Sequence, residues 1–208
     1  QCGAISDTAH RLMALEDEAK RVRKTDGNKR KTLLGIPKLE DANLAGTARS
    51  HECTLLLTEG DSAKAMAVAG LSVVGRDKFG VFPLKGKPVN ANNKNAKSNA
   101  EVVNLKRILG LKDRCTYDTA EKRSKLRYGR VRILADQDVD GIHIKGLILY
   151  LFFKKWPELV RHGYVDTMLT PLLKVFPRRG RGPPVAFYTQ AAYEQRADEL
   201  AGARVKYY

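Results

Sequence analysis

The strongest constraint on the fold is an alternation of short apolar runs and longer segments of helical spacing between Cys53 and Trp156. Runs of strand length occupy residues 53–57, 79–84 and 129–135, and helical spacing follows at 59–70, 99–109 and 142–156. Strand–helix repeats of this length indicate parallel strands with helical crossovers. We therefore expect an α/β fold, a parallel sheet flanked by helices.

The segments on either side of this core have a different pattern. A surface helix is expected from Ser6 to Arg23, followed by a basic connector and a turn-rich stretch. Past Trp156 the pattern predicts strands at 168–177 and 184–189 around a basic turn, and a last strand at 205–208. The predicted organisation has three parts, listed here by residue: a leading helix and linker (1–50), a core (51–156) and a β-rich extension (157–208).

The charge balance points to a polyanionic partner. The chain has 38 Lys+Arg against 23 Asp+Glu, a net charge of +15, which favours DNA or RNA. No segment reaches 18 consecutive apolar residues, so no membrane span is expected. Three scattered cysteines without a CxxC pair argue against structural zinc. The first residues lack the features of a signal peptide, and we expect a fragment of a longer polypeptide.

Three aspartates follow directly after the third apolar run of this basic chain. If the chain there is extended, Asp136, Asp138 and Asp140 point the same way, at the carboxyl end of a strand where open α/β sheets bind ligands. Gly141 would allow a sharp turn into the next helix. Three carboxylates this close repel one another unless a cation neutralises them. Hard oxygen ligands favour magnesium or calcium over zinc.

The three aspartates have two other possible interpretations. A calcium EF-hand begins in the same way but needs a bidentate Glu at its twelfth position, which here is Leu147. The EF-hand reading therefore fails. A solvated acidic turn remains open, although the apolar residues on both sides would tie the turn to the core.

Glu59 comes at the end of the first predicted strand, just as Asp136 comes at the end of the third. If those two strands are neighbours, Glu59 faces the aspartates and completes an acidic pocket. A lone Glu after a strand can equally be a helix cap or an ion-pair partner. His10, His51 and His162 lack matching partners and are expected to be surface or structural residues.

A metal pocket in a basic protein suggests phosphodiester chemistry. Magnesium can polarise a phosphoryl oxygen, and paired ions can clamp the attacking and leaving oxygens. Surrounding Lys and Arg residues would hold backbone phosphates. No Walker loop of the form GxxxxGK[ST] is present, so nucleotide hydrolysis is not expected in this chain.

The sequence resembles the Toprim domain of type IIA DNA topoisomerases, in its eukaryotic form. The resemblance is carried by "TEGDSA" (58–63), "PLKGKPVN" (83–90) and "DQDVDGIHIKG" (136–146). Further similar stretches occur in the same order, and the likeness runs from about Leu34 to Tyr208. It implies a Rossmann-like Toprim fold and an isomerase that changes DNA topology through transient double-strand breaks.

The resemblance also implies roles for individual residues. Glu59 would bind metal near the scissile phosphate and assist proton transfer. Asp136 and Asp138 would hold magnesium, two ions per site, with Asp140 supporting the second. The residues expected close to double-stranded DNA are Lys85, Lys87, His143 and Lys145. Those expected to border the cleaved step, where topoisomerase poisons insert, are Gly60, Asp61 and Ser62.

The chain departs from the family pattern at two of these positions. Ile142 stands where the family usually has Ser, which would remove a hydroxyl contact. Lys85 replaces an Arg found in many eukaryotic relatives, and a point charge lacks the bidentate geometry of a guanidinium.

The family's other catalytic parts lie outside this stretch. Its nucleophilic Tyr belongs to a winged-helix domain supplied by the partner subunit of a homodimer, and its ATP is used by a preceding ATPase domain. We expect the chain alone to be inactive, and the whole protein to be nuclear or, alternatively, mitochondrial. The competing hypotheses are a Toprim-type nuclease or primase and a non-catalytic DNA-binding module.

Overall fold

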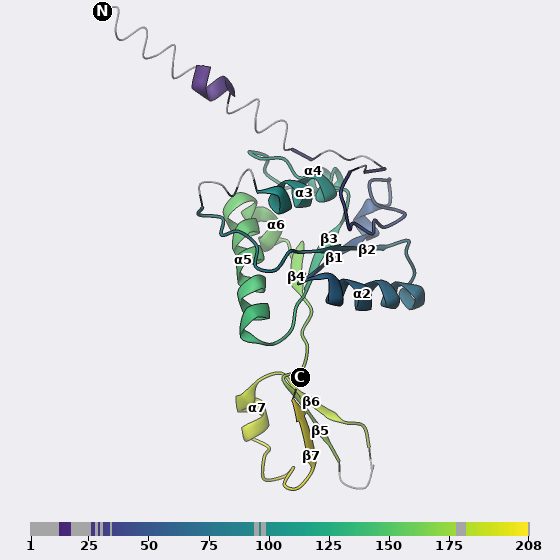
Figure 1. Ribbon diagram of the computed structural model, residues 1–208, viewed down its shortest axis with the longest axis vertical. Helices are drawn as coiled ribbons and strands as arrows, with labels where there is room; N and C mark the ends of the chain where they lie inside the picture. Colours follow the sequence, from purple (N-terminus) through teal and green to yellow (C-terminus); the bar gives the residue numbers. More distant parts are fainter. Residues whose placement is uncertain are drawn as a thin grey trace, which may run out of the picture.

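Figure 1 shows the computed structural model of the chain. The expected helix from Ser6 to Arg23 lies mostly outside the described residues, although 13–17 are helical. The basic turn at 178–181 also lies outside them. The structure describes residues 13–17, 26–27, 29, 31–33, 35–93, 96, 99–177 and 182–207.

The core contains a four-stranded parallel sheet in the order β2-β1-β3-β4. Its strands are β1 (Thr54–Thr58), β2 (Phe79–Pro83), β3 (Arg130–Leu134) and β4 (Val165–Thr167). The first three confirm the predicted strands and the predicted parallel sheet. The sequence did not reveal β4, because three residues carry too little periodicity. This edge strand also lies past residue 156, where the core was expected to end.

Helices cover both faces of the sheet (Figure 1). On one face α2 (Asp61–Val74) packs Ala67 and Leu71 against Val81 of β2. The other face is covered by the remaining core helices, whose residues share one cluster with β1 and β3. These elements are α3 (Ala100–Leu109), α5 (Val139–Lys155) and α6 (Pro157–Arg161), with α4 (Ala120–Ser124) and the 3₁₀ turn η1 (Ser50–Glu52) nearby.

The predicted end of α2 and the predicted start of α5 were wrong, whereas the predicted end of α3 was correct. The α2 helix passes through Gly70 and ends at Gly75, with φ 89°, because Leu71 is needed in the core. The α5 helix begins at Val139, three residues before the expected start. The α3 helix ends at Gly110, with φ 76°, as predicted, and the structure adds that Asn99 caps its first turn.

The β-rich extension forms a second, antiparallel sheet in the order β6-β5-β7 (Figure 1). Its core contains Leu173, Val175 and Phe187. The elements are β5 (Leu173–Phe176), β6 (Val185–Phe187), α7 (Gln190–Glu194) and β7 (Arg204–Tyr207). The predicted strands are thus confirmed within the described residues.

A buried charged cluster joins the segment before β1 to the core. Arg127 is fully buried, and its guanidinium donates to the Ile108 carbonyl at 2.7 Å and to Asp41 Oδ2 at 2.5 Å. The Tyr128 hydroxyl donates to the other oxygen of Asp41 at 2.5 Å. Because the charge is paired and hydrogen-bonded, its burial is tolerated. No helix in the described part of the chain is long and apolar enough to cross a membrane.

Candidate active site

Glu59 and the acidic loop, residues 136–140, leave the sheet at the same edge. The strands before them, β1 and β3, are adjacent and parallel, and Thr58 is paired with Leu134. The two strands are therefore neighbours, as the predicted acidic pocket requires. Both acidic segments lie at the carboxyl end of the sheet, the edge at which open α/β sheets bind ligands.

The electrostatics of Glu59 show that the acids influence one another. Burial raises the pKa of the Glu59 carboxyl, and the charges of Asp138, Asp136 and Asp140 raise that pKa further, in this order. A carboxylate so disfavoured in its charged form gains most from a nearby cation. The three aspartates after β3 thus act electrostatically on Glu59, which follows β1.

The local geometry of the acidic loop differs from the extended arrangement expected. Asp138 is the N-cap of α5, and its carboxylate accepts a hydrogen bond from the Gly141 N–H at 2.7 Å. Asp140 lies in the first helical turn and forms a 2.8 Å ion pair with Lys87 Nζ. Lys87, and to a lesser degree His143, lower the pKa of Asp140. A loop followed by a helix, and not one strand face, therefore places the three aspartates.

Within the described residues, no three His, Cys, Asp or Glu side chains are already gathered into a metal cluster. The Asp138 carboxylate caps α5, and the Asp140 carboxylate is ion-paired with Lys87. The donor chemistry nevertheless fits a hard divalent cation, because the four candidate ligands are all carboxylates. Burial raises the pKa of Glu59 most, and the negative charges of the three aspartates raise it further.

Two of the residues predicted to contact DNA, Lys85 and Lys87, lie on the segment that follows β2. The segment after β2 runs beside the end of β1, since the Leu84 N–H donates to the Thr58 carbonyl at 2.8 Å and the Gly86 N–H to the Glu59 carbonyl at 3.4 Å. This brings Lys87 to the acidic loop. Lys85, whose backbone N–H donates to Glu101 of α3, is exposed on the same segment.

The basic residues of α5 lie beside the loop itself. Lys145 Nζ donates to the Asp136 carbonyl at 3.1 Å and to Gln137 Oε1 at 3.0 Å. His143 is exposed on the first turns of the helix. Ile142, which stands where the family usually has Ser, is also exposed there, with 56% of its surface accessible.

Gly60, Asp61 and Ser62 form the start of α2, directly after Glu59. The Thr58 hydroxyl donates to the Gly60 carbonyl at 3.1 Å, which fixes the turn between strand and helix. Asp61 makes a 2.5 Å ion pair with Lys38. The three residues therefore lie next to the acidic site along the chain.

Gly141 has a more specific role than the turn expected from sequence. A Cβ atom there would lie 2.2 Å from the Asp136 carbonyl oxygen, so a larger residue would force the loop apart. Sequence reasoning also missed Gln137, Thr170, Pro171 and Lys174, which line a pocket beside the acidic loop. The "TPLLK" stretch carries no signal for this, since it reads as an ordinary strand.

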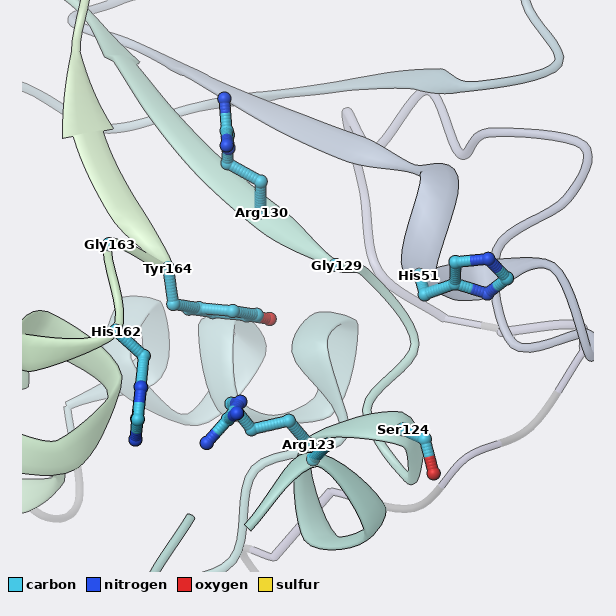
Figure 2. Close-up of a pocket in the computed structure, with 9 residues that line it drawn as sticks. His51, Arg123, Ser124, Gly129, Arg130, His162, Gly163 and Tyr164 are labelled. Carbon is cyan, nitrogen blue, oxygen red and sulfur yellow. The ribbon is translucent and has the colours of Figure 1, made fainter. Parts of the chain in front are cut away.

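A second pocket, of about 250 Å³, lies at the opposite edge of the sheet (Figure 2). Its cationic side chains already have protein partners: Arg123 donates to the Tyr117 and Asp118 carbonyls, and Arg130 pairs with Asp166. The other side chains include His51 and His162, both exposed as expected. No acidic residue lines this pocket, whereas Glu59 and the three aspartates lie at the carboxyl edge.

Comparisons with known proteins agree with this architecture. The family model described as the Toprim domain matches residues 54–167. DNA topoisomerase 2 of Bombyx mori is 47% identical over 191 residues, which is 89% of this chain and 12% of that protein. The mitochondrial DNA topoisomerase 2 of Dictyostelium discoideum is 45% identical over 204 residues, 93% of this chain and 16% of that protein.

A solved structure gives the same result at the level of the fold. The DNA-binding, cleavage and re-ligation domain of Plasmodium falciparum topoisomerase II is 47% identical, with a TM-score of 0.76, over 86% of this chain and 25% of that one. The chain thus spans only a small part of the relatives it matches. With the family model covering more than half of its length and the site at the expected edge, the chain belongs to the Toprim domain family and is similar to eukaryotic type II DNA topoisomerases.

Proposed function

We propose that the chain forms the metal-binding part of the DNA cleavage–religation centre of an ATP-dependent type II DNA topoisomerase. The observation that carries the proposal is the pairing of Thr58 with Leu134, which brings Glu59 and the acidic loop to one edge of a Toprim sheet. The similarity to topoisomerase 2 proteins supports the same assignment. A nuclease, a primase and a passive DNA-binding module are less favoured.

In this proposal, Glu59, Asp136 and Asp138 hold magnesium, two ions per site, and Asp140 supports the second. Bound magnesium would polarise the scissile phosphoryl oxygen and stabilise the leaving oxygen. Glu59 would move a proton at the reacting oxygen, a role suited to a carboxyl whose pKa is raised. The DNA backbone would be held by Lys85, Lys87, His143 and Lys145, and Gly60, Asp61 and Ser62 would border the cleaved step.

The remaining parts of the reaction would come from outside this chain. A winged-helix domain of the partner subunit would supply the nucleophilic Tyr in a homodimer, and an ATPase domain would drive strand passage. We also propose that the chain is divided into three parts: a leading segment (1–50), a Toprim core (51–156) and an extension (157–208). The nucleus is the proposed compartment, with the mitochondrion as the alternative.

The test is relaxation of supercoiled plasmid by the full-length protein with magnesium and ATP. Glu59→Gln and Asp136→Asn should each abolish relaxation, because each removes a metal ligand while retaining side-chain volume. Glu121→Gln, an exposed acid on α4, is the matched control and should relax DNA normally. Normal relaxation by either site variant would refute the proposal, and nicking by the isolated chain would favour the nuclease.

A further inference from the structure

The pocket of about 250 Å³ in Figure 2 lies where β3 and β4 begin, at the edge of the sheet opposite the acidic loop. Gly129 and Tyr164, which come directly before these two strands, line it together with residues of α4. The lining contains two arginines and two histidines but no acidic residue: Arg123, Arg130, His51 and His162. The pocket is therefore a small cationic cavity.

Arg123 brings a positive charge that is not paired with a carboxylate in the described part of the chain. Its Nη1 group donates to two backbone carbonyls, at 3.0 and 2.8 Å, and both acceptors are neutral. Its Nε and Nη2 groups make no hydrogen bond among the described residues. Of the acids beside it in the sequence, Asp118 is paired with Lys122. Glu121 is paired with Lys125. Arg123 is thus anchored through Nη1, with Nε and Nη2 left for a ligand.

Arg130 adds a second charge, which is only partly compensated. Its guanidinium lies 3.6 Å from the carboxylate of Asp166. That carboxylate already accepts two hydrogen bonds of 2.8 Å from Arg132. Because one carboxylate serves two guanidiniums, the three side chains together carry a net positive charge. This charge adds to the positive potential of the pocket.

His162 offers a hydrogen-bond donor on the same side of the pocket as Arg123. In Figure 2 the His162 imidazole and the Arg123 guanidinium both lie below the Tyr164 ring. The His162 side chain is exposed and makes no hydrogen bond among the described residues. An imidazole carries at least one N–H donor in either of its neutral forms. His51 is given no role, because its Nδ1 faces the Ala48 carbonyl at 3.3 Å.

We propose that this pocket binds a phosphate group, free or as a monoester, through the Arg123 guanidinium and the His162 imidazole. The Nε and Nη2 groups of a guanidinium can donate two parallel hydrogen bonds to one oxyanion. Arg132 uses the same two groups to hold Asp166 in this structure. A doubly charged phosphate also suits a lining with two arginines and no acid.

The size of the cavity fits this ligand. Pockets for drug-sized ligands have volumes of roughly 300–1,000 Å³, and this one, at about 250 Å³, is smaller. It therefore suits a single charged group. The inference does not depend on the acidic site or on the proposed function, because none of its residues lies at the carboxyl edge of the sheet.

The experiment is a calorimetric titration of inorganic phosphate into the full-length protein without magnesium. Arg123→Met removes a charge-assisted pair of hydrogen bonds and should weaken phosphate binding at least about tenfold. Arg123→Lys keeps the charge without the paired geometry and should give an intermediate affinity. Arg196→Met, which removes an exposed guanidinium of the extension, is the matched control and should bind phosphate like the wild type.

His162→Ala keeps the test decisive if Arg123→Met does not fold. Since the His162 side chain makes no hydrogen bond among the described residues, this variant should keep its melting temperature. It should bind phosphate about fivefold more weakly, the effect of one lost hydrogen bond. Unchanged phosphate affinity in both His162→Ala and Arg123→Met would overturn the inference.

Two further arms identify the source of the phosphate. A phosphoserine peptide and its unphosphorylated form are titrated into the same proteins. Tighter binding of the phosphopeptide than of inorganic phosphate, lost in Arg123→Met, would identify a phosphorylated protein segment; equal affinity would identify the free ion. If both variants lost affinity for a DNA duplex but kept their affinity for phosphate, the pocket would belong to DNA and the inference would be overturned. The proposed function is tested separately, because all these variants keep Glu59 and Asp136.

Discussion

Thr58 and Leu134 are paired across the adjacent parallel strands β1 and β3. Everything proposed for the site depends on this register, because Glu59 follows one strand and the acidic loop follows the other. A shift of one residue would turn Glu59 to the other face of the sheet. The register is specified by buried side chains on both strands, such as Leu57 and Ile133.

The first prediction concerns the pKa of Glu59. This pKa is raised by burial and by the aspartates, so the folded state binds a proton more readily than the unfolded state. The stability contributed by this group is therefore lost as pH rises from the ordinary Glu value through the raised one. Magnesium favours the charged carboxylate and should lower the pKa of Glu59.

Carbon-detected NMR titration of the side-chain carboxyls, with and without magnesium, measures this change. Asp118 is an internal reference, because its pKa is lowered by Lys122, away from the acidic loop. A Glu59 pKa that does not respond to saturating magnesium would count against a metal at this carboxylate.

The second prediction concerns Gly141. In Gly141→Ala the new Cβ would meet the Asp136 carbonyl oxygen, so the loop must move. We expect a destabilisation of about 1–3 kcal/mol together with weaker magnesium binding. The measurements are urea unfolding and calorimetric titration of magnesium.

The matched control is Gly146→Ala in the same helix, where a Cβ would meet nothing within 4 Å. That variant should gain roughly 0.5–1 kcal/mol of stability, since Ala is the better helix former. Equal behaviour of the two variants would show that the close approach of Gly141 to Asp136 has no energetic weight.

The third prediction concerns the buried cluster of Arg127, Asp41 and Tyr128. Arg127→Met removes the guanidinium while keeping a long apolar side chain, and leaves Asp41 without its cation. Breaking a buried ion pair in this way should cost roughly 3–5 kcal/mol of unfolding free energy in a urea titration. Arg196→Met, which breaks an exposed pair with Glu199, should change it by less than about 1 kcal/mol. Similar losses of unfolding free energy in the two variants would show that burial does not make the Arg127–Asp41 pair more important than an exposed pair.

The parallel sheet could be predicted from sequence because its central strands are apolar runs bounded by turn residues. The acidic site could be predicted because Glu59 and Asp136 each follow such a run, and strand ends of a parallel sheet meet at one edge. The start of α5 could not be predicted. The residues after Asp138, Val139 and Asp140, do not indicate that Asp138 caps a helix. Thr170 and Lys174 were missed for a different reason: only the folded chain brings the extension against the acidic loop.

Glu59 and Asp136, which follow the adjacent strands β1 and β3, are proposed to act as one metal site in DNA cleavage. The most direct test is magnesium-dependent DNA cleavage by the full-length protein carrying Glu59→Gln, Asp136→Asn or both, with Glu121→Gln as control. Residues of one catalytic unit give non-additive losses. We predict a loss of at least about a hundredfold in each single variant and no further loss in the double variant. Additive losses, or a single variant that cleaves normally, would show that Glu59 and Asp136 do not act as one site.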